Sequence, residues 1–169
     1  MGKFISGLLL GIILLPAVLL VIFATGNFPV AATAHPSPWE TKLAQFVLAK
    51  AIARQAPVLK NPLEPRDQNL LAGMKVFHEA CDGCHGTANQ RSTWGTTDFY
   101  PRVPQFGFEP PTLPDWQIFW VAKNGIRYTG MGGYSPDMSD DNAWKVALFL
   151  SRLNSLPPEV AVKWRQRNP

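Results

Sequence analysis

The clearest chemistry in this chain lies in residues 81–85, which read Cys-Asp-Gly-Cys-His. A Cys-x-x-Cys-His run is the attachment signature of a c-type haem, because two thiols on one helical turn can each add to a vinyl group of the same porphyrin. The histidine that follows offers an imidazole to the iron. Cys81 and Cys84 are the only cysteines, so a multi-disulfide framework and four-cysteine zinc or iron-sulfur sites lack ligands. The motif therefore predicts one haem c bonded to Cys81 and Cys84, with His85 as an axial ligand of its iron.

The second axial ligand decides what the iron can do, because a thioether leaves no open position for a substrate and raises the reduction potential. The candidates are Met131 and Met138, which both lie in the loop expected before the last helix. Met131 is flanked by Gly130 and Gly132, which let the backbone come close to the porphyrin, whereas Met138 lies within two or three residues of an expected helix cap. We therefore expect Met131 to be the ligand, against the alternative that it only fills the core.

An uncharged stretch rich in Leu, Ile and Val occupies residues 4–24. It is long enough to span a bilayer, which takes about 20 apolar residues, and transmembrane helices tolerate an internal proline such as Pro16. A signal peptide cleaved after Ala34 is the alternative. Because the stretch exceeds the roughly 7 to 15 apolar residues of such a signal, we expect residues 1–25 to form an uncleaved membrane anchor.

The formal net charge is +4, and haem propionates would offset part of it. No cluster of basic residues with interleaved aromatics appears along the chain. Such clusters are typical of nucleic-acid-binding surfaces, so we expect no binding to nucleic acid.

Beyond the anchor, the spacing of apolar residues predicts helices joined by proline-rich connectors. An apolar stripe in the helix expected at 39–55 could lie on lipid headgroups, pack on the protein or contact a partner subunit; packing on the protein is the commonest outcome. Asp67 is expected to cap a helix that leads to the haem motif. Asp140 or Asp141 is expected to cap a last helix that runs to about residue 154, rather than to serve in acid-base chemistry. A short helix is expected at 116–123, and a long loop around the haem at 86–114.

The predicted helix before the motif carries Leu70, Met74 and Phe77 on one face. Gly73, which has no side chain, suits the close approach of another helix. His78 lies on the same helix, where a lone histidine is more often a surface or packing residue than a ligand.

Residues 70–156 resemble a membrane-anchored, monohaem class I cytochrome c of bacteria. The likeness includes residues 73–77 before the motif, and the motif itself at 81–86. The run at 123–131, Lys-Asn-Gly-Ile-Arg-Tyr-Thr-Gly-Met, is similar to the distal methionine loop of the family, and residues 144–153 resemble its C-terminal helix.

The resemblance implies an all-α fold, the class I cytochrome c fold around one covalent haem c, preceded by a transmembrane helix. The first and last helices of the domain would cross near Gly73 and Phe77, with His85 as the proximal and Met131 as the distal ligand. Members of the family commonly carry proline directly after the distal methionine. Gly132 stands there in this chain, so the loop is less stiff.

Four segments follow from this interpretation: the anchor at 1–25, a linker with one helix and a connector at 26–66, the cytochrome c domain at 67–156, and a C-terminal tail at 157–169. The implied function is electron transfer by Fe(III)/Fe(II) cycling, as a carrier or a fixed subunit of a respiratory or dehydrogenase complex rather than as an enzyme. Haem attachment in this family occurs outside the cytoplasm, which implies a single-pass protein of the bacterial cytoplasmic membrane with a periplasmic haem domain. Its partners would be the membrane and redox proteins or complex subunits, with no small-molecule substrate at the iron.

Two alternatives use the same residues differently. A membrane-anchored thiol-disulfide oxidoreductase would use Cys81 and Cys84 as a redox dithiol, but it needs alternating strands and helices around the motif. A haem sensor or peroxidase would have an open sixth position, which predicts that Met131 does not bind iron.

Five residues could donate hydrogen bonds to the haem propionates: Tyr100, Arg102, Trp116, Trp120 and Arg127.

Overall fold

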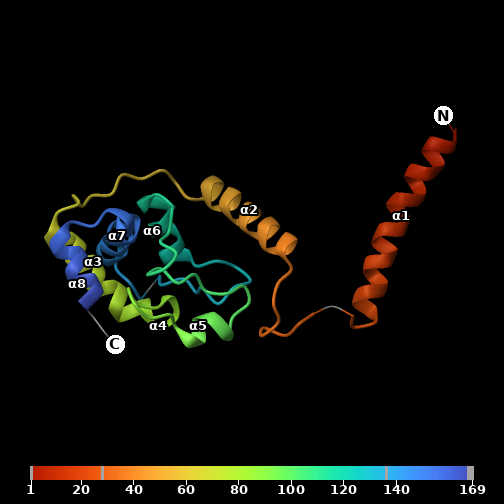
Figure 1. Ribbon diagram of the computed structural model, residues 1–169. Coiled ribbons are helices and arrows are strands. Elements are labelled where there is room, and N and C mark those ends of the chain that lie inside the picture. Colours follow the sequence, from red (N-terminus) through yellow and green to blue (C-terminus); the bar gives the residue numbers. More distant parts are fainter. Residues whose placement is uncertain (1, 28, 136, 167–169) are drawn as a thin grey trace. The chain divides into compact units, whose positions relative to one another are not determined.

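The computed structural model in Figure 1 describes residues 2–27, 29–135 and 137–166, and it divides into two compact units, Met1–Ala34 and His35–Pro169. Every regular element in these described ranges is a helix. The prediction of an all-α fold is therefore confirmed.

The first unit contains the helix α1, Gly2–Ala24, which is continuous through Pro16. Lys3 is its one charged residue, an 18-residue window of the helix has a mean hydropathy of 2.9, and none of its residues is buried. By length and composition it could cross a membrane, as predicted.

The second unit begins with α2, Pro38–Gln55, whose start is fixed by a capping box between Ser37 and Glu40. Only one side of this helix packs on the protein, where Ile52 and the adjoining Ala56 are buried. The expectation that the apolar stripe packs on the protein is wrong, because the chain leaves that side of the helix uncovered. The exposed stripe consists of Trp39, Leu43, Phe46 and Val47.

A connector without helix, residues 56–66, leads from α2 to α3, Asp67–Ala80. Arg66 rather than Asp67 is the N-cap residue, so the predicted cap is wrong by one position. The carboxylate of Asp67 lies instead in the first turn, where a negative charge still favours the helix dipole.

The centre of the second unit is the crossing of α3 with α7, Asp140–Ser151 (Figure 1). A Cβ atom added at Gly73 would lie 2.1 Å from the carbonyl oxygen of Lys145 and 2.8 Å from Cβ of Phe149. The prediction that Gly73 permits a close helix approach is confirmed. The predicted apolar face of α3 is buried, with Leu70 1%, Met74 6% and Phe77 0% exposed.

The start of α7 differs from the prediction. Ser139 is the N-cap, and its hydroxyl accepts a hydrogen bond from the backbone N–H of Asn142 at 3.2 Å. Asp140 and Asp141 follow in the first turn, so the prediction that one of them caps the helix is wrong; a serine hydroxyl one residue earlier already takes that role. The helix also ends earlier than expected and continues as the 3-10 turn η1, Leu153–Ser155.

Two further helices complete the core. The predicted short helix is α6, Asp115–Asn124, and its Phe119 ring stacks on Trp144 of α7 with centroids 4.0 Å apart. The segment expected as a tail contains α8, Pro158–Gln166, in which Val160 and Trp164 are buried. These two apolar residues, four positions apart, lie on one helical face and pack on α3. Residues 167–169 lie outside the described part of the chain.

Candidate haem attachment site

The haem motif forms a helical turn of its own directly after α3. Cys81 ends α3 with φ −123° and ψ −32°, and α4, Asp82–His85, begins immediately. The backbone N–H groups of Cys84 and His85 donate hydrogen bonds to the carbonyl oxygen of Cys81 at 3.2 and 2.9 Å. One turn therefore holds both thiols and the imidazole, as the chemistry of attachment requires.

The His85 ring is buried and oriented by the loop that follows. Its Nδ1 donates a hydrogen bond to the Pro104 carbonyl oxygen at 2.9 Å, and the ring stacks on Phe106 with centroids 4.2 Å apart. Burial lowers the pKa of His85, while the backbone hydrogen bond to Pro104 opposes that effect. A neutral imidazole that donates from Nδ1 carries its lone pair on Nε2, which is the form that binds iron. The side chain present therefore fits a haem ligand.

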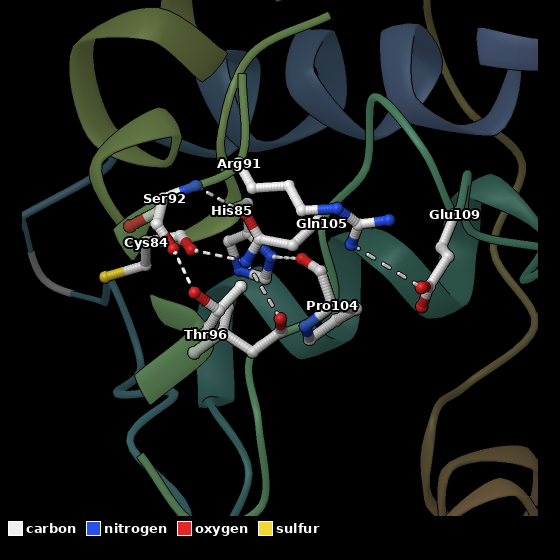
Figure 2. Close-up of polar contacts among 9 residues, drawn as sticks. Cys84, His85, Arg91, Ser92, Thr96, Pro104, Gln105 and Glu109 are labelled. Atoms are coloured by element: carbon white, nitrogen blue, oxygen red, sulfur yellow. Dashed lines mark hydrogen bonds and ion pairs between the residues drawn. The ribbon is translucent and has the colours of Figure 1, made fainter. Parts of the chain in front are cut away.

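A buried glutamine fastens the loop to the motif (Figure 2). Gln105 is 2% exposed, and its amide donates to the carbonyl oxygens of Cys84 at 3.0 Å and Val103 at 2.9 Å. Its side-chain oxygen accepts from the backbone N–H of Ser92 at 2.7 Å. The Ser92 hydroxyl donates in turn to the Gly83 carbonyl oxygen at 2.6 Å. Motif and loop are thus joined by polar contacts as well as by apolar packing.

The segment 86–114, expected as one long loop, contains a short helix, α5, Thr93–Thr97, because the Ser92 hydroxyl caps its start. This helix approaches the motif backbone closely. A Cβ atom added at Gly95 would lie 2.0 Å from the Cys84 carbonyl oxygen. Only glycine fits at this contact, because any side chain would collide with the motif backbone, as at the helix crossing next to Gly73.

The two candidate distal methionines have different surroundings. Met138 is 7% exposed and belongs to the main hydrophobic core. Met131 is half-buried outside that core, and its backbone is held by hydrogen bonds to Thr129 at 3.0 Å and from Ile126 at 2.9 Å. Met138 is thus committed to packing, whereas the side chain of Met131 remains the better candidate for an iron ligand.

The protonation of the two thiols bears on the redox-dithiol alternative. Burial, followed by the nearby Asp82 and Cys84, raises the pKa of Cys81 to about 12. Burial also raises the pKa of Cys84. A thiol-disulfide oxidoreductase needs a lowered pKa, because the thiolate is the nucleophile. The surroundings of both thiols oppose that alternative.

Sequence reasoning missed Ser92, Gln105 and Tyr134 at this site. The Tyr134 hydroxyl donates to the Ala80 carbonyl oxygen at 2.6 Å, which joins the distal loop to the end of α3. Burial, and then the two nearby cysteines of the motif, raise the pKa of Tyr134. Nothing in the local sequence distinguishes these residues from other polar loop residues.

His78 proves to be a packing residue, as expected. Its side chain is 1% exposed, and Nδ1 donates to the Asp82 carboxylate at 3.0 Å. Two of the proposed propionate donors are engaged elsewhere: the Tyr100 hydroxyl donates to Glu40, and Arg102 donates to backbone carbonyl oxygens at 2.6 and 2.7 Å.

Within the described ranges, no group of three or more His, Cys, Asp or Glu side chains could hold a metal ion. A porphyrin brings four nitrogen ligands of its own and needs only axial ligands from the protein. The imidazole of His85 is oriented to supply one such axial ligand.

Comparison with known proteins identifies one matching family, described as cytochrome c oxidase, cbb3-type, subunit III, which matches residues 68–150. No curated protein matches the chain. A solved chain of the reducing HAO-like protein complex of Kuenenia stuttgartiensis is similar, with a TM-score of 0.43 and 22% sequence identity. That match covers 56% of this chain and 48% of the other, so it spans about half of the neighbour's length.

Proposed function

Residues 68–150 form a cytochrome c domain for haem-based electron transfer, and from this premise we propose that the chain is a membrane-anchored, monohaem electron-transfer protein. Cys81 and Cys84 hold one haem c, and His85 and Met131 are its axial ligands. The observation that carries the proposal is the hydrogen bond from Nδ1 of His85 to the Pro104 carbonyl oxygen. His85 itself lies in the helical turn that also holds both cysteines. The hydrogen bond leaves Nε2 with the lone pair that an iron ligand needs.

Haem c bound here would supply a one-electron Fe(III)/Fe(II) couple. The Pro104 carbonyl oxygen keeps the Nδ1 proton in place and fixes the orientation of the His85 ring. Phe106 covers one face of that ring, and the amide of buried Gln105 ties the loop to the motif backbone. These contacts resist movement of the ligand when the charge at the iron changes, and electron transfer is faster where little has to reorganise.

Met131 as the distal ligand is supported by its place outside the core, in a loop closed by hydrogen bonds to both of its backbone groups. With two axial ligands from the protein, no small-molecule substrate would bind the iron. The chain then acts as a redox component and has no catalytic reaction of its own.

The apolar helix α1 supports a single-pass anchor in the bacterial cytoplasmic membrane, with the haem domain on the periplasmic side. The matching family is described as a subunit of an oxidase. This description supports a role as a fixed subunit of a respiratory complex over a free carrier. Purification from native membrane tests that role, since a fixed subunit brings its partner subunits with it.

The ligand assignment is tested by two matched variants, Met131→Leu and Met138→Leu, which remove the thioether and nearly conserve side-chain volume. Ferric haem with a bound thioether shows a weak long-wavelength absorption band. We expect the band to vanish in Met131→Leu and to persist in Met138→Leu. The opposite pattern would assign the ligand to Met138, and absence of the band from the parent protein would exclude methionine ligation.

Covalent attachment has a separate test. The purified protein should remain haem-stained after denaturing electrophoresis, because thioether bonds survive unfolding. A colourless band from cells that attach haem c to other proteins would refute the proposed function.

A further inference from the structure

One side of α2 presents four large apolar side chains to solvent: Trp39, Leu43, Phe46 and Val47, which are 69%, 53%, 61% and 55% exposed. Their spacing of three and four residues places them on one helical face, called here the α2 outer face. Contiguous exposed apolar surface of this kind marks an interaction site.

The α2 outer face is also basic. Lys42, Lys50 and Arg54 are exposed and share the face by their spacing from the apolar residues, and Lys50 Nζ lies 5.7 Å from the ring centroid of Phe46. The single acidic residue of α2, Glu40, is occupied elsewhere, since it accepts hydrogen bonds from the Ser37 backbone and the Tyr100 hydroxyl. Aromatic and aliphatic groups and three cations thus share this side of α2, whose one anion, Glu40, is engaged by Tyr100.

We propose that the α2 outer face docks on anionic lipid headgroups of the membrane in which α1 is anchored. Helices at a membrane interface bury Trp, Phe and Leu at the headgroup level, and the long side chains of Lys and Arg beside them can extend toward lipid phosphates. This inference rests on the proposed anchoring by α1. The linker of residues 25–37 reaches no further than about 45 Å, so the anchor holds α2 within reach of the bilayer.

The charge of the face favours lipid over a second copy of the chain. A two-fold contact through this face would bring six cations together, and the Glu40 carboxylate of each copy is already engaged by Tyr100. Anionic headgroups complement all three at once, and each cation near such a surface strengthens binding about fivefold.

Docking of α2 would also orient the haem domain. The Glu40 carboxylate, on the inner side of α2, accepts a hydrogen bond from Tyr100. Tyr100 belongs to the loop that fastens His85 and Cys84 through Pro104 and Gln105. A docked α2 therefore holds this loop at a defined angle to the membrane instead of leaving the domain free on its linker.

The test uses the complete holoprotein, one copy per lipid nanodisc, with a nitroxide attached to an added cysteine. Val47→Cys reports on the α2 outer face, and Val162→Cys is the matched control, since Val162 is 49% exposed on α8. Thioether bonds to haem leave the two native cysteines unreactive. Collisions of the nitroxide with oxygen, which enters the lipid, and with a nickel chelate, which stays in water, are measured. Discs of phosphatidylcholine alone are compared with discs that also contain phosphatidylglycerol.

We expect the label at position 47 to lose collisions with the nickel chelate and gain collisions with oxygen in the anionic discs, while the label at 162 stays unchanged. The triple variant Lys42→Gln/Lys50→Gln/Arg54→Gln should weaken docking about 100-fold, at about fivefold per cation. It should return the label at 47 to water without loss of haem.

Three results would overturn the proposal: a label at 47 that stays accessible to nickel in anionic discs, equal protection in phosphatidylcholine alone, or protection only with two copies per disc. Failure of the proposed function looks different. Protein that does not remain with the discs would refute the anchor, and disc-bound protein whose haem neither ascorbate nor dithionite can reduce would refute electron transfer.

Discussion

Replacing Gly73 by alanine should destabilise the cytochrome domain, although alanine is the better helix former. The added Cβ atom would lie 2.1 Å from the Lys145 carbonyl oxygen and 2.8 Å from Cβ of Phe149. The first of these contacts is about 1.3 Å shorter than ordinary van der Waals contact. Backbone atoms cannot rotate away, so α3 and α7 must separate and loosen the packing around Phe149, which is fully buried.

The magnitude follows from two opposing effects. Gly→Ala in a helix interior gains about 1 kcal/mol, whereas overpacking costs up to about 3 kcal/mol. The free energy of unfolding should therefore fall by about 2 kcal/mol, which lowers the Tm of a domain of this size by roughly 10 °C.

Gly83→Ala is the matched control, because Gly83 is helical and a Cβ atom there would meet nothing within 4 Å. Chemical denaturation of the holoproteins in detergent, followed by haem absorbance, measures both variants against the parent. We expect Gly83→Ala to be neutral or slightly stabilising. A Gly73→Ala protein as stable as Gly83→Ala would refute the close helix crossing.

Three further outcomes are expected. Gln105→Ala should lower the free energy of unfolding by about 2 to 4 kcal/mol, because buried groups of the motif and loop lose their hydrogen-bond partners. Chemical denaturation measures this loss, and an unchanged midpoint would contradict the hydrogen bonds assigned to Gln105. Trp164→Ala should cost about 3 to 5 kcal/mol in the same assay, against less than about 0.5 kcal/mol for the exposed Val162→Ala; equal effects would show that α8 does not contribute to the core. The hydrogen bond to Glu40 raises the pKa of Tyr100 because it favours the neutral phenol; Glu40→Gln should lower that pKa toward its ordinary value in a ¹³C-tyrosine NMR titration, and an unchanged value would exclude the contact.

The helices were largely predictable because their signals are local. Apolar residues at helical spacing placed α3 and α6 within one or two residues of their observed bounds. The cap positions were harder to predict. Ser139 and the two aspartates after it are all favourable N-cap residues, so the sequence does not fix which of them begins α7. The packed helix α8 was missed, because its buried face consists of only two residues, Val160 and Trp164, in a short segment that also carries charged side chains.

The periodicity of α2 illustrates a general limit. Spacing shows which residues share a helical face, but it does not show whether anything covers that face. The stripe that begins at Trp39 has the same pattern as a buried face, and only the structure shows it exposed.

The sequence by itself predicted the cofactor and its attachment, because the chemistry of capture resides in five adjacent residues, from Cys81 to His85. Only the tertiary structure decided what surrounds them. The Pro104 carbonyl oxygen lies 19 residues from His85 along the chain, and the Gln105 amide lies 21 residues from Cys84. Such contacts depend on the path of an irregular loop, which no periodic pattern encodes. The same packing buries Met138 and leaves Met131 outside the core, which agrees with the choice of Met131 that the flanking glycines favoured.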